Sequence, residues 1–249
     1  MKDISKTELK DVNKEFLHVD PLEEKYRESI AEAPGIVESI EKHKTALLVI
    51  DLQYLDAAPG FGVFANAEKS GVPKEAQEYY FKRLDHVVLA NVRKLQDKFR
   101  DLGLEVIHTR IMSMTNDGRE RSPGHKRLNL HAAPGSKESE FLVEVEPKGD
   151  EIIINKTASG VFNATNVEYI LRNMGITGLF ICGVYTNECV STTVRDACDR
   201  GFYTTMINDA CATVTPELHN ATIDTIRDRY ARVMTTEEAV KELKELASE

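Results

Sequence analysis

Short apolar runs recur along the chain between longer stretches in which apolar and polar residues are mixed. Six runs have this character, at residues 45–51, 104–110, 151–155, 178–184, 203–209 and 231–235. Several of them are aliphatic without alternation, which is typical of strands buried on both faces. Helices are expected between the runs, over residues 81–102 and 163–173 and from residues 187, 216 and 236 onward. Alternating strands and helices predict an α/β fold with a parallel sheet covered on both faces.

Residues 1–44 precede the first of these strands and are mostly polar, with prolines at positions 21 and 34. We expect them to form an N-terminal arm, and residues 45–249 to form one domain. A chain of 249 residues can bury a substantial core without disulfides or metal. The predicted fold is therefore a single three-layer α/β/α domain around a six-stranded, mainly parallel sheet.

Composition narrows the class of protein. The net charge of -9 argues against a nucleic-acid surface, and no apolar run approaches the ~20 residues that span a bilayer. The N-terminal segment is charged from its second residue and lacks the apolar region of a signal peptide. The four cysteines form no C-x-x-C pair, which favours free thiols in a reducing compartment. We expect a cytoplasmic protein that binds neither nucleic acid nor membrane.

The stretch from Gly178 to Phe202 carries a strand through a polar turn to Cys189 at the start of a helix. Thr186 is the expected N-cap, which places Cys189 at the third helical position. The free N–H groups and dipole of a helix N-terminus lower the pKa of a thiol from about 8.5. The other three cysteines are expected to be buried and structural, as most free cysteines are. Cys189 is therefore the candidate nucleophile.

Polar residues end most of the predicted strands, namely Asp51, His108 with Arg110, Lys156, and Asn208 with Asp209. Ligands of open parallel sheets bind beyond the carboxyl ends of the strands. Asp51 and Lys156 should therefore meet Cys189 at one edge of the sheet. A carboxylate and an ammonium beside a cysteine at a helix start predict a catalytic site.

With these residues in place, the chain resembles the isochorismatase-like cysteine hydrolase family, which includes nicotinamidase, N-carbamoylsarcosine amidase and the ureidoacrylate and biuret amidohydrolases. The resemblance runs from about residue 45 to the end and rests on LLVIDLQ, NKTASGVFNAT, GVYTNECVSTTVRDACDRGF and INDACAT. It implies a Rossmann-type strand order and a catalytic triad. In this triad Asp51 is the base, Cys189 is the nucleophile, and Lys156 keeps both of them charged.

The resemblance also implies the surroundings of the triad. The backbone N–H groups of Tyr185 and Cys189 would form an oxyanion hole, after a cis peptide bond between Val184 and Tyr185. Gln53 and Phe162 lie in the matching motifs and are implied substrate-binding residues, together with the Tyr185 side chain. Tyr185 differs from the small residue expected there in nicotinamidases.

A basic stretch, GRERSPGHKRLNLH at residues 118–131, interrupts this acidic chain. It is either a solvated loop or a source of substrate contacts. Arg110, or one of the basic residues of this stretch, is expected to bind a substrate carboxylate or carbonyl, because a guanidinium fork suits that geometry.

Two other patterns are weak. PGFGVFA at residues 59–65 resembles a dinucleotide fingerprint, but its first glycine comes nine residues after Asp51, so a loop beside the pocket is the better interpretation. His108, Asp117, His125 and His131 have irregular spacing without a short ligand pair. We therefore expect neither a metal nor another cofactor.

The sequence thus predicts a cysteine amidohydrolase, a hydrolase of C–N bonds in linear amides, that works through a thioester and releases ammonia. Ureidoacrylate, biuret or N-carbamoyl compounds are favoured over nicotinamide as the small-molecule substrate. One alternative is an isochorismate-type vinyl ether hydrolase, although those proteins resemble this chain with the nucleophile absent. Another is a non-catalytic member of the family that serves binding or assembly. The resemblance also leads us to expect a homo-oligomer, either a dimer or a tetramer.

Overall fold

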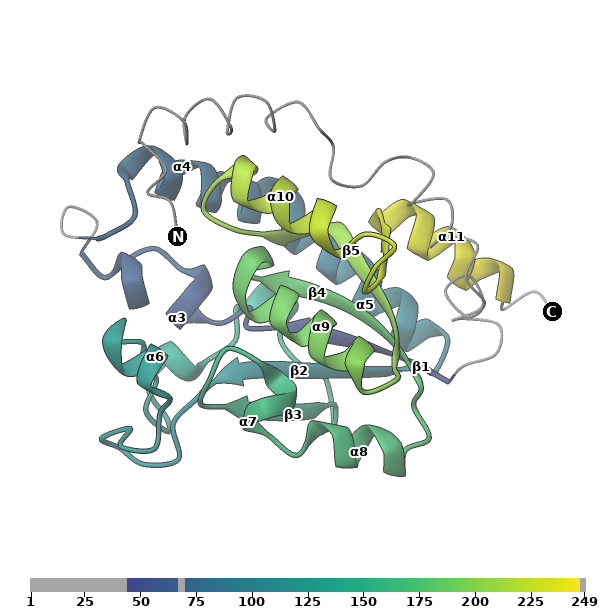
Figure 1. Cartoon of the computed structure of the whole chain (residues 1–249), viewed down its shortest axis with the longest axis horizontal. Coiled ribbons are helices and arrows are strands. Elements are labelled where there is room, and N and C mark those ends of the chain that lie inside the picture. The colour runs from purple at the N-terminus through teal and green to yellow at the C-terminus, as the bar shows by residue number, and fades with distance from the viewer. Residues whose placement is uncertain (1–43, 67–69, 247–249) are drawn as a thin grey trace, which may run out of the picture. The chain divides into compact units, whose positions relative to one another are not determined.

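The structure is a computed structural model that describes residues 44–66 and 70–246 (Figure 1). The expected N-terminal arm lies outside the described residues, except for Lys44. Six parallel strands form one sheet in the order β3-β2-β1-β4-β5-β6. The strands are β1 (Thr45–Ile50), β2 (Glu105–Ile111), β3 (Ile152–Lys156), β4 (Gly178–Val184), β5 (Tyr203–Ala212) and β6 (Arg232–Met234). The predicted α/β fold and its six-stranded parallel sheet are confirmed.

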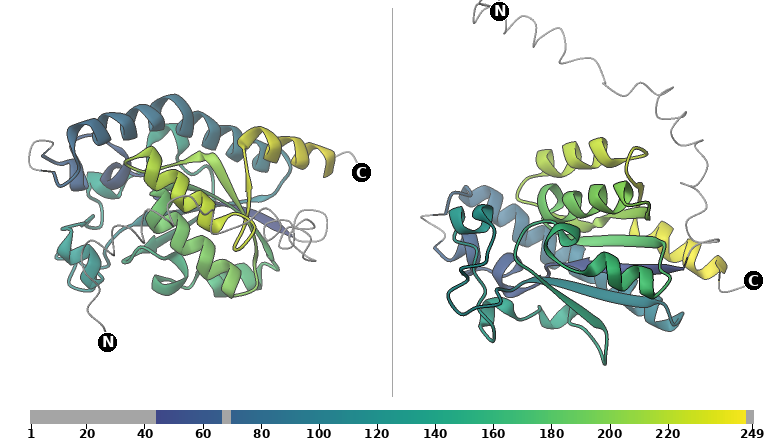
Figure 2. Two further views of the ribbon diagram at one scale, coloured as in Figure 1. Left: turned by 45° about the horizontal axis from the view of Figure 1, so that its top comes forward. Right: turned by 60° about the horizontal axis from the view of Figure 1, so that its bottom comes forward.

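Helices cover both faces of this sheet. The α-helices are α3 (Tyr54–Ala57), α4 (Lys74–Arg83), α5 (Leu89–Asp101), α6 (Pro123–Arg127), α7 (Val161–Ala164), α8 (Val167–Asn173), α9 (Ser191–Asp199), α10 (Pro216–Ile226) and α11 (Thr236–Leu246). The 3₁₀ helices are η1 (Gly62–Phe64), η3 (Lys137–Ser139) and η4 (Val143–Val145). The π-helical turns are η2 (Leu84–Val88) and η5 (Thr186–Val190). Figure 1 shows α9 and α10 in front of the sheet with α5 and α11 behind it, and the views in Figure 2 agree.

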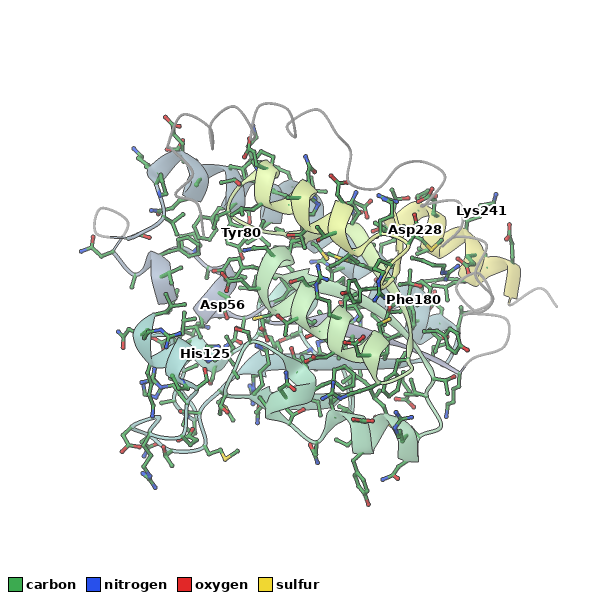
Figure 3. All side chains as sticks on the ribbon, in the orientation of Figure 1. Asp56, Tyr80, His125, Phe180, Asp228 and Lys241 are labelled. Atoms are coloured by element: carbon green, nitrogen blue, oxygen red, sulfur yellow. The ribbon has the colours of Figure 1, made fainter. Side chains whose placement is uncertain are left out.

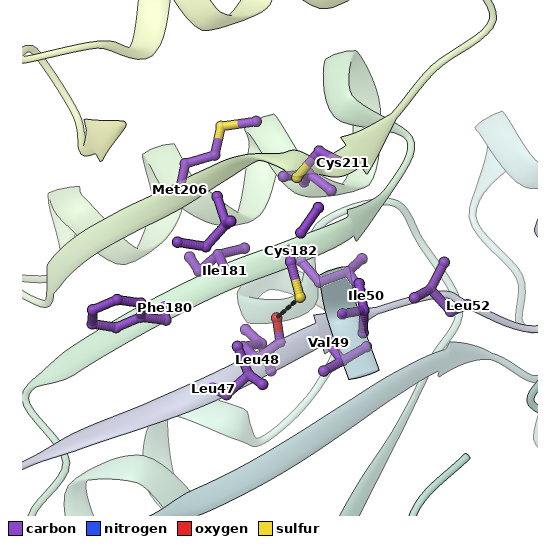
Figure 4. Close-up of a cluster of buried hydrophobic side chains, with 14 of the residues drawn as sticks. Leu47, Leu48, Val49, Ile50, Leu52, Phe180, Ile181, Cys182, Met206 and Cys211 are labelled. Carbon is purple, nitrogen blue, oxygen red and sulfur yellow. Dashed lines mark hydrogen bonds between the residues drawn. The ribbon is translucent and has the colours of Figure 1, made fainter. Parts of the chain in front are cut away.

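The two central strands form the middle of the core. Every residue of β1 and of β4 is buried, as their continuous apolar runs predict. Figure 4 shows Leu48 of β1, Ile181 of β4 and Met206 of β5 packed across the strands. Cys182 lies fully buried in the same cluster, with its sulfur 4.0 Å from the carbonyl oxygen of Leu48. The burial predicted for Cys182 is therefore confirmed, whereas Cys198, which was also expected to be buried, is half-buried.

Close contact between β1 and β4 depends on Gly183. Its φ is 119°, a value that side chains rarely allow, and a Cβ atom there would lie 2.1 Å from the carbonyl oxygen of Ile50. The register pairs Ile50 with Gly183. The next residues, Asp51 directly after β1 and Val184 at the end of β4, therefore lie side by side at the edge of the sheet.

Strand β5 differs from its prediction. It was expected to end at Asn208 and Asp209, but it continues to Ala212 through an irregularity in its pairing with β4. The side chain of Asp209 accepts hydrogen bonds from the backbone N–H and hydroxyl of Thr236 at 2.7 and 2.8 Å. Asp209 thereby fixes the start of α11 and has a structural role in the motif that contains it.

Two helix predictions also need correction. The helix expected over residues 81–102 begins earlier, at Lys74, and continues through η2 into α5. Its first turns bury Gln77 and Tyr80, polar and aromatic residues that an apolar pattern does not reveal. The helix expected over residues 163–173 is two helices, α7 and α8. The hydroxyl of Thr165 separates them, because it accepts a hydrogen bond from the N–H of Val167 at 3.1 Å.

Candidate active site

The three residues expected to form a triad meet at the carboxyl edge of the sheet, on the left in Figure 1. Lys156 is the last residue of β3, and its Nζ atom lies 2.7 Å from Oδ2 of Asp51. The same Nζ lies 3.3 Å from Sγ of Cys189. Asp51 and Lys156 are fully buried, and Cys189 is 4% exposed. The ammonium thus lies between a carboxylate and a thiol in an almost dry environment.

Asp51 is held by backbone geometry and by strand β2. Its φ is 54°, which is uncommon for a residue with a side chain, so the chain turns sharply out of β1 at this point. Its N–H donates to the carbonyl oxygen of Thr109 at 3.1 Å, and the Thr109 hydroxyl donates to Oδ1 at 2.9 Å. Oδ1 is therefore occupied by Thr109, and Oδ2 faces Lys156. Thr109 gave no signal in the sequence.

Lys156 keeps its charge despite burial. Burial alone would lower its pKa, but the negative charge of Asp51, assisted by Cys189, raises the pKa above the ordinary value. Its Nζ atom also donates to the carbonyl oxygen of Ala158 at 3.0 Å. The lysine is therefore a fixed ammonium with three partners.

The turn that carries Cys189 differs from its prediction. The residue before the first helical residue is Tyr185, so Cys189 is the fourth residue of η5 and not the third. Thr186 does not cap the helix, because its hydroxyl lies 2.9 Å from Nδ1 of His219. The N–H groups of Glu188 and Val190 both donate to the carbonyl oxygen of Tyr185.

The expected lowering of the Cys189 pKa is wrong for this structure. Burial raises the pKa of the thiol above its ordinary value, and the positive charge of Lys156 offsets only part of this rise. Asp51 is one reason, because it already balances the charge of Lys156. Burial therefore favours a neutral thiol beside the ion pair, and such a thiol would need a base before it could act as a nucleophile.

The peptide bond between Val184 and Tyr185 is cis, as predicted. The Tyr185 hydroxyl donates to the backbone carbonyl of Asp56 at 2.9 Å, and its ring centre lies 5.1 Å from that of Tyr80. The Tyr80 hydroxyl donates to the same carbonyl at 2.8 Å. These contacts connect the chain after β1 to the turn that carries Cys189.

A cavity of about 640 Å³ lies beside this turn. Its lining includes Gly62, Val63, Arg127, Leu128, Tyr185 and Glu188. A volume of this size is typical of small-molecule sites. The glycine-rich stretch at residues 59–65 therefore contributes to a pocket, as its better interpretation predicts.

Gln53 does not face the cavity. It is fully buried, and its amide nitrogen donates to the carbonyl oxygens of Ile111 and Glu138 at 2.9 and 2.8 Å. Its amide oxygen accepts the N–H of Ile111 at 2.5 Å. Both ends of the amide thus hold the backbone after β2, so Gln53 has a structural role where substrate contact was expected.

Arg110 and Phe162 are also directed elsewhere. Arg110 donates to Oδ1 of Asn155 at 2.7 Å and to the carbonyl oxygen of Ser139 at 2.9 Å. The ring of Phe162 lies 5.6 Å from that of Phe202, beneath the guanidinium of Arg200. Of the expected substrate-binding side chains, the structure brings only Tyr185 to the cavity.

Asp56 and His125 lie near the triad but were not predicted as site residues. Asp56 follows Asp51 by five positions, and His125 occupies α6 within the basic stretch. Both are buried. Asp56 had no sequence signal beyond its closeness to Asp51, while His125 was considered only as a metal ligand.

The buried side chain of His219 contacts η5 through the hydroxyl of Thr186. Nε2 of His219 lies 2.6 Å from Oδ1 of Asn208 and 3.2 Å from the guanidinium of Arg83. Burial and the charge of Arg83 lower the pKa of His219 to about 4. A neutral His219 therefore positions Thr186, three residues before Cys189.

The candidate metal ligands do not gather. Within residues 44–66 and 70–246 no three His, Cys, Asp or Glu side chains are arranged to hold a metal ion. His108 instead lies 2.9 Å from Glu151, and Asp117 pairs with Arg119 at 3.1 Å. Over the same described ranges, no helix combines the length and apolar character that crossing a membrane requires.

Comparison with known proteins gives consistent matches. The family model described as isochorismatase domain matches residues 45–238. The isochorismatase family protein YwoC of Bacillus subtilis is 29% identical over 215 residues, which cover 83% of this chain and 97% of YwoC. The ureidoacrylate amidohydrolase RutB of Acinetobacter baylyi is 28% identical over 215 residues, 79% of this chain and 82% of RutB.

A solved structure is similar as well. N-carbamoylsarcosine amidase from Thermoplasma acidophilum superposes with a TM-score of 0.57 at 25% sequence identity. The match covers 78% of this chain and 96% of that protein.

Proposed function

Because the chain belongs to the isochorismatase family, we propose that it is a cysteine amidohydrolase that cleaves a C–N bond of a small linear amide, ureide or carbamoyl compound and releases ammonia. An amidohydrolase and an amidase among its relatives support a role as a hydrolase. One observation carries the finer proposal, the position of Lys156 within 2.7 Å of Asp51 and 3.3 Å of Cys189.

In the first step Asp51 accepts the thiol proton of Cys189 as sulfur bonds to the substrate carbonyl carbon. The raised pKa of the thiol makes this transfer necessary. Lys156 stabilises the sulfur as it loses its proton, because its ammonium remains beside both groups. The negative charge moves from the carboxylate through sulfur to the carbonyl oxygen, within reach of one fixed cation.

The resulting oxyanion needs donors in fixed positions. We assign this role to the backbone N–H groups of Tyr185 and Cys189, on either side of the turn that follows the cis peptide bond. Each such donor is worth about 3 to 4 kcal/mol of transition-state stabilisation in known hydrolases. The hydrogen bond from Tyr185 to Asp56 holds this turn in place.

Collapse of the tetrahedral intermediate breaks the C–N bond, and Asp51 returns its proton to the leaving nitrogen, which departs as ammonia. A thioester on Cys189 remains. Asp51 then takes a proton from water as the water oxygen attacks the thioester carbonyl. The C–S bond breaks, sulfur regains a proton from Asp51, and the acid product leaves. Every proton passes through Asp51, so the site ends as it began.

The test is ammonia release from ureidoacrylate, biuret, N-carbamoyl amino acids, nicotinamide and maleamate. We expect activity on at least one compound, and its loss in Cys189→Ala. Cys198→Ala is the matched control, because Cys198 is a half-buried free cysteine of α9 that has no role in the proposed reaction. An acid quench during turnover should leave an acyl adduct on Cys189 by mass spectrometry.

Activity that survives Cys189→Ala would refute the proposal. Turnover of isochorismate by that variant would support the vinyl ether hydrolase, because such a reaction needs no nucleophilic sulfur. A wild-type protein that releases no ammonia and forms no adduct with any of these compounds would favour the binding or assembly role.

A further inference from the structure

Two buried polar side chains near the triad have unused hydrogen-bonding atoms. Asp56 is 2% exposed, and His125 is 3% exposed. Within the described ranges 44–66 and 70–246, Oδ2 of Asp56 and both ring nitrogens of His125 have no hydrogen-bond partner. Buried polar groups are almost always paired, so each such exception calls for an explanation. Figure 3 labels both residues and places them at the same end of the molecule, beyond the ends of the strands.

Asp56 is fixed close to the turn of the nucleophile. Helix α3 begins three residues after Asp51, and the backbone carbonyl of Asp56 accepts the hydroxyls of Tyr80 and Tyr185. Tyr185 lines the cavity and lies four residues before Cys189. These bonds use the backbone of Asp56 and leave Oδ2 of its carboxyl group unpaired.

His125 is held by a different element, close to Lys156. The N–H of Ser122 donates to the carbonyl oxygen of Thr157, the residue after Lys156, at 2.9 Å. The Ser122 hydroxyl in turn accepts the N–H of His125 at 3.2 Å. Arg127 and Leu128, which follow His125, line the cavity. A separate element therefore brings this second unpaired side chain to the same region.

Burial favours the uncharged form of both side chains. Burial raises the pKa of Asp56 well above its ordinary value, and the charge of Asp51 adds to this effect against that of Lys156. Burial lowers the pKa of His125 to about 4, with a further contribution from Lys156. A neutral carboxyl and a neutral imidazole each offer one donor and one acceptor. In these uncharged forms, neither side chain offers a charge to an ionic ligand.

We propose that Asp56 and His125 are substrate-binding residues that select an uncharged ureide, whose carbonyl has an N–H on both sides. A ureide can give an N–H to each of the two side chains and receive a donor at its carbonyl. A plain carboxamide has an N–H on one side only, so it would leave one buried polar group unpaired. This inference rests on the proposed amidohydrolase function and specifies its substrate class.

The test compares biuret with malonamide, in which a CH₂ replaces the bridging N–H of biuret. Wild-type kcat/KM should favour biuret by roughly tenfold to hundredfold, because malonamide leaves a buried group without a partner. In Asp56→Leu and His125→Leu, kcat/KM for biuret should fall by about tenfold or more, and the preference for biuret should shrink. Comparing ratios between variants removes the difference in intrinsic reactivity of the two compounds.

Conservative variants separate this role from a charged one. Asp56→Asn and His125→Gln keep a donor and an acceptor, so both should retain most of the preference for biuret. An Asp56→Asn variant as impaired as Asp56→Leu would overturn the proposal, because it would mean that a carboxylate charge is needed. An unchanged preference in folded Asp56→Leu and His125→Leu would overturn it too. If Asp56→Leu does not fold, the His125 variants decide, since His125 lies on a different element.

Binding separates failure of this inference from failure of the proposed function. Calorimetric titration of Cys189→Ala with biuret and malonamide reports affinity without turnover. Preferential binding of biuret, with no ammonia released by the wild type, would leave the inference standing and refute the amidohydrolase. Cys189-dependent ammonia release with no preference for biuret in binding or turnover would refute the inference alone. Failure of Cys189→Ala to bind either compound would also overturn the inference.

Discussion

Replacement of Lys156 with methionine tests whether the buried ion pair organises the site. Methionine keeps an unbranched side chain but removes the ammonium, so the carboxylate of Asp51 would lie buried against an apolar group. The two charges are 2.7 Å apart, and both side chains are at most 1% exposed. At an effective dielectric constant of about 20, their Coulomb attraction is about 6 kcal/mol before desolvation is counted.

Breaking a buried pair from one side typically costs about 3 to 5 kcal/mol, because the remaining charge is uncompensated. We expect Lys156→Met to lower the free energy of unfolding by this amount, a large share of the ~5 to 15 kcal/mol of a typical domain. The double variant Asp51→Asn/Lys156→Met removes both charges. It should be more stable than Lys156→Met by about 2 kcal/mol or more, while both variants are inactive.

Urea unfolding followed by circular dichroism measures these differences. Lys148→Met is the matched control, because that lysine is 65% exposed and 3.5 Å from Asp97, and its loss should cost less than about 1 kcal/mol. A cost of less than about 1 kcal/mol for Lys156→Met would contradict a stabilising ion pair. A double variant that lost the sum of the two single losses would contradict it too, because the two charges would then be independent.

Three further predictions follow from other parts of the structure. Gly183→Ala should lower the free energy of unfolding by more than about 3 kcal/mol, because its Cβ would lie 2.1 Å from the Ile50 carbonyl oxygen. Gly149→Ala, with positive φ but open space, should cost about 1 to 2 kcal/mol in the same assay. Iodoacetamide labelling of Cys189, followed by mass spectrometry, should accelerate with pH to beyond pH 9, because burial raises the thiol pKa; a plateau by pH 7 would contradict this. As pH falls from about 6.5 towards 4, the folded state should lose up to about 3 kcal/mol through His219, whose pKa is about 4 when folded and about 6.5 when unfolded. Urea unfolding at several pH values gives the number of protons taken up on unfolding, and this number should be roughly one smaller for His219→Gln than for the wild type.

The sequence by itself was sufficient for the sheet and for the residues at its edge. Continuous aliphatic runs predicted β1 and β4, because a strand between two neighbours and two helix layers has no solvent side that would require polar residues. Asp51 and Lys156 could be placed beside Cys189 from topology alone, since the carboxyl ends of parallel strands share one edge. These inferences succeed because strand formation and chain direction are local properties of the sequence.

Only the tertiary structure decided what those residues and their neighbours contact. The Gln53 side chain hydrogen-bonds to the backbone after β2, and the Arg110 side chain hydrogen-bonds to Asn155. No local sequence pattern shows these contacts, because the hydrogen-bond partners come from distant segments. The pKa of Cys189 reverses its predicted direction for a similar reason. A helix terminus is a local feature, but burial on all sides is a property of the whole fold, and here burial outweighs the other effects on the thiol.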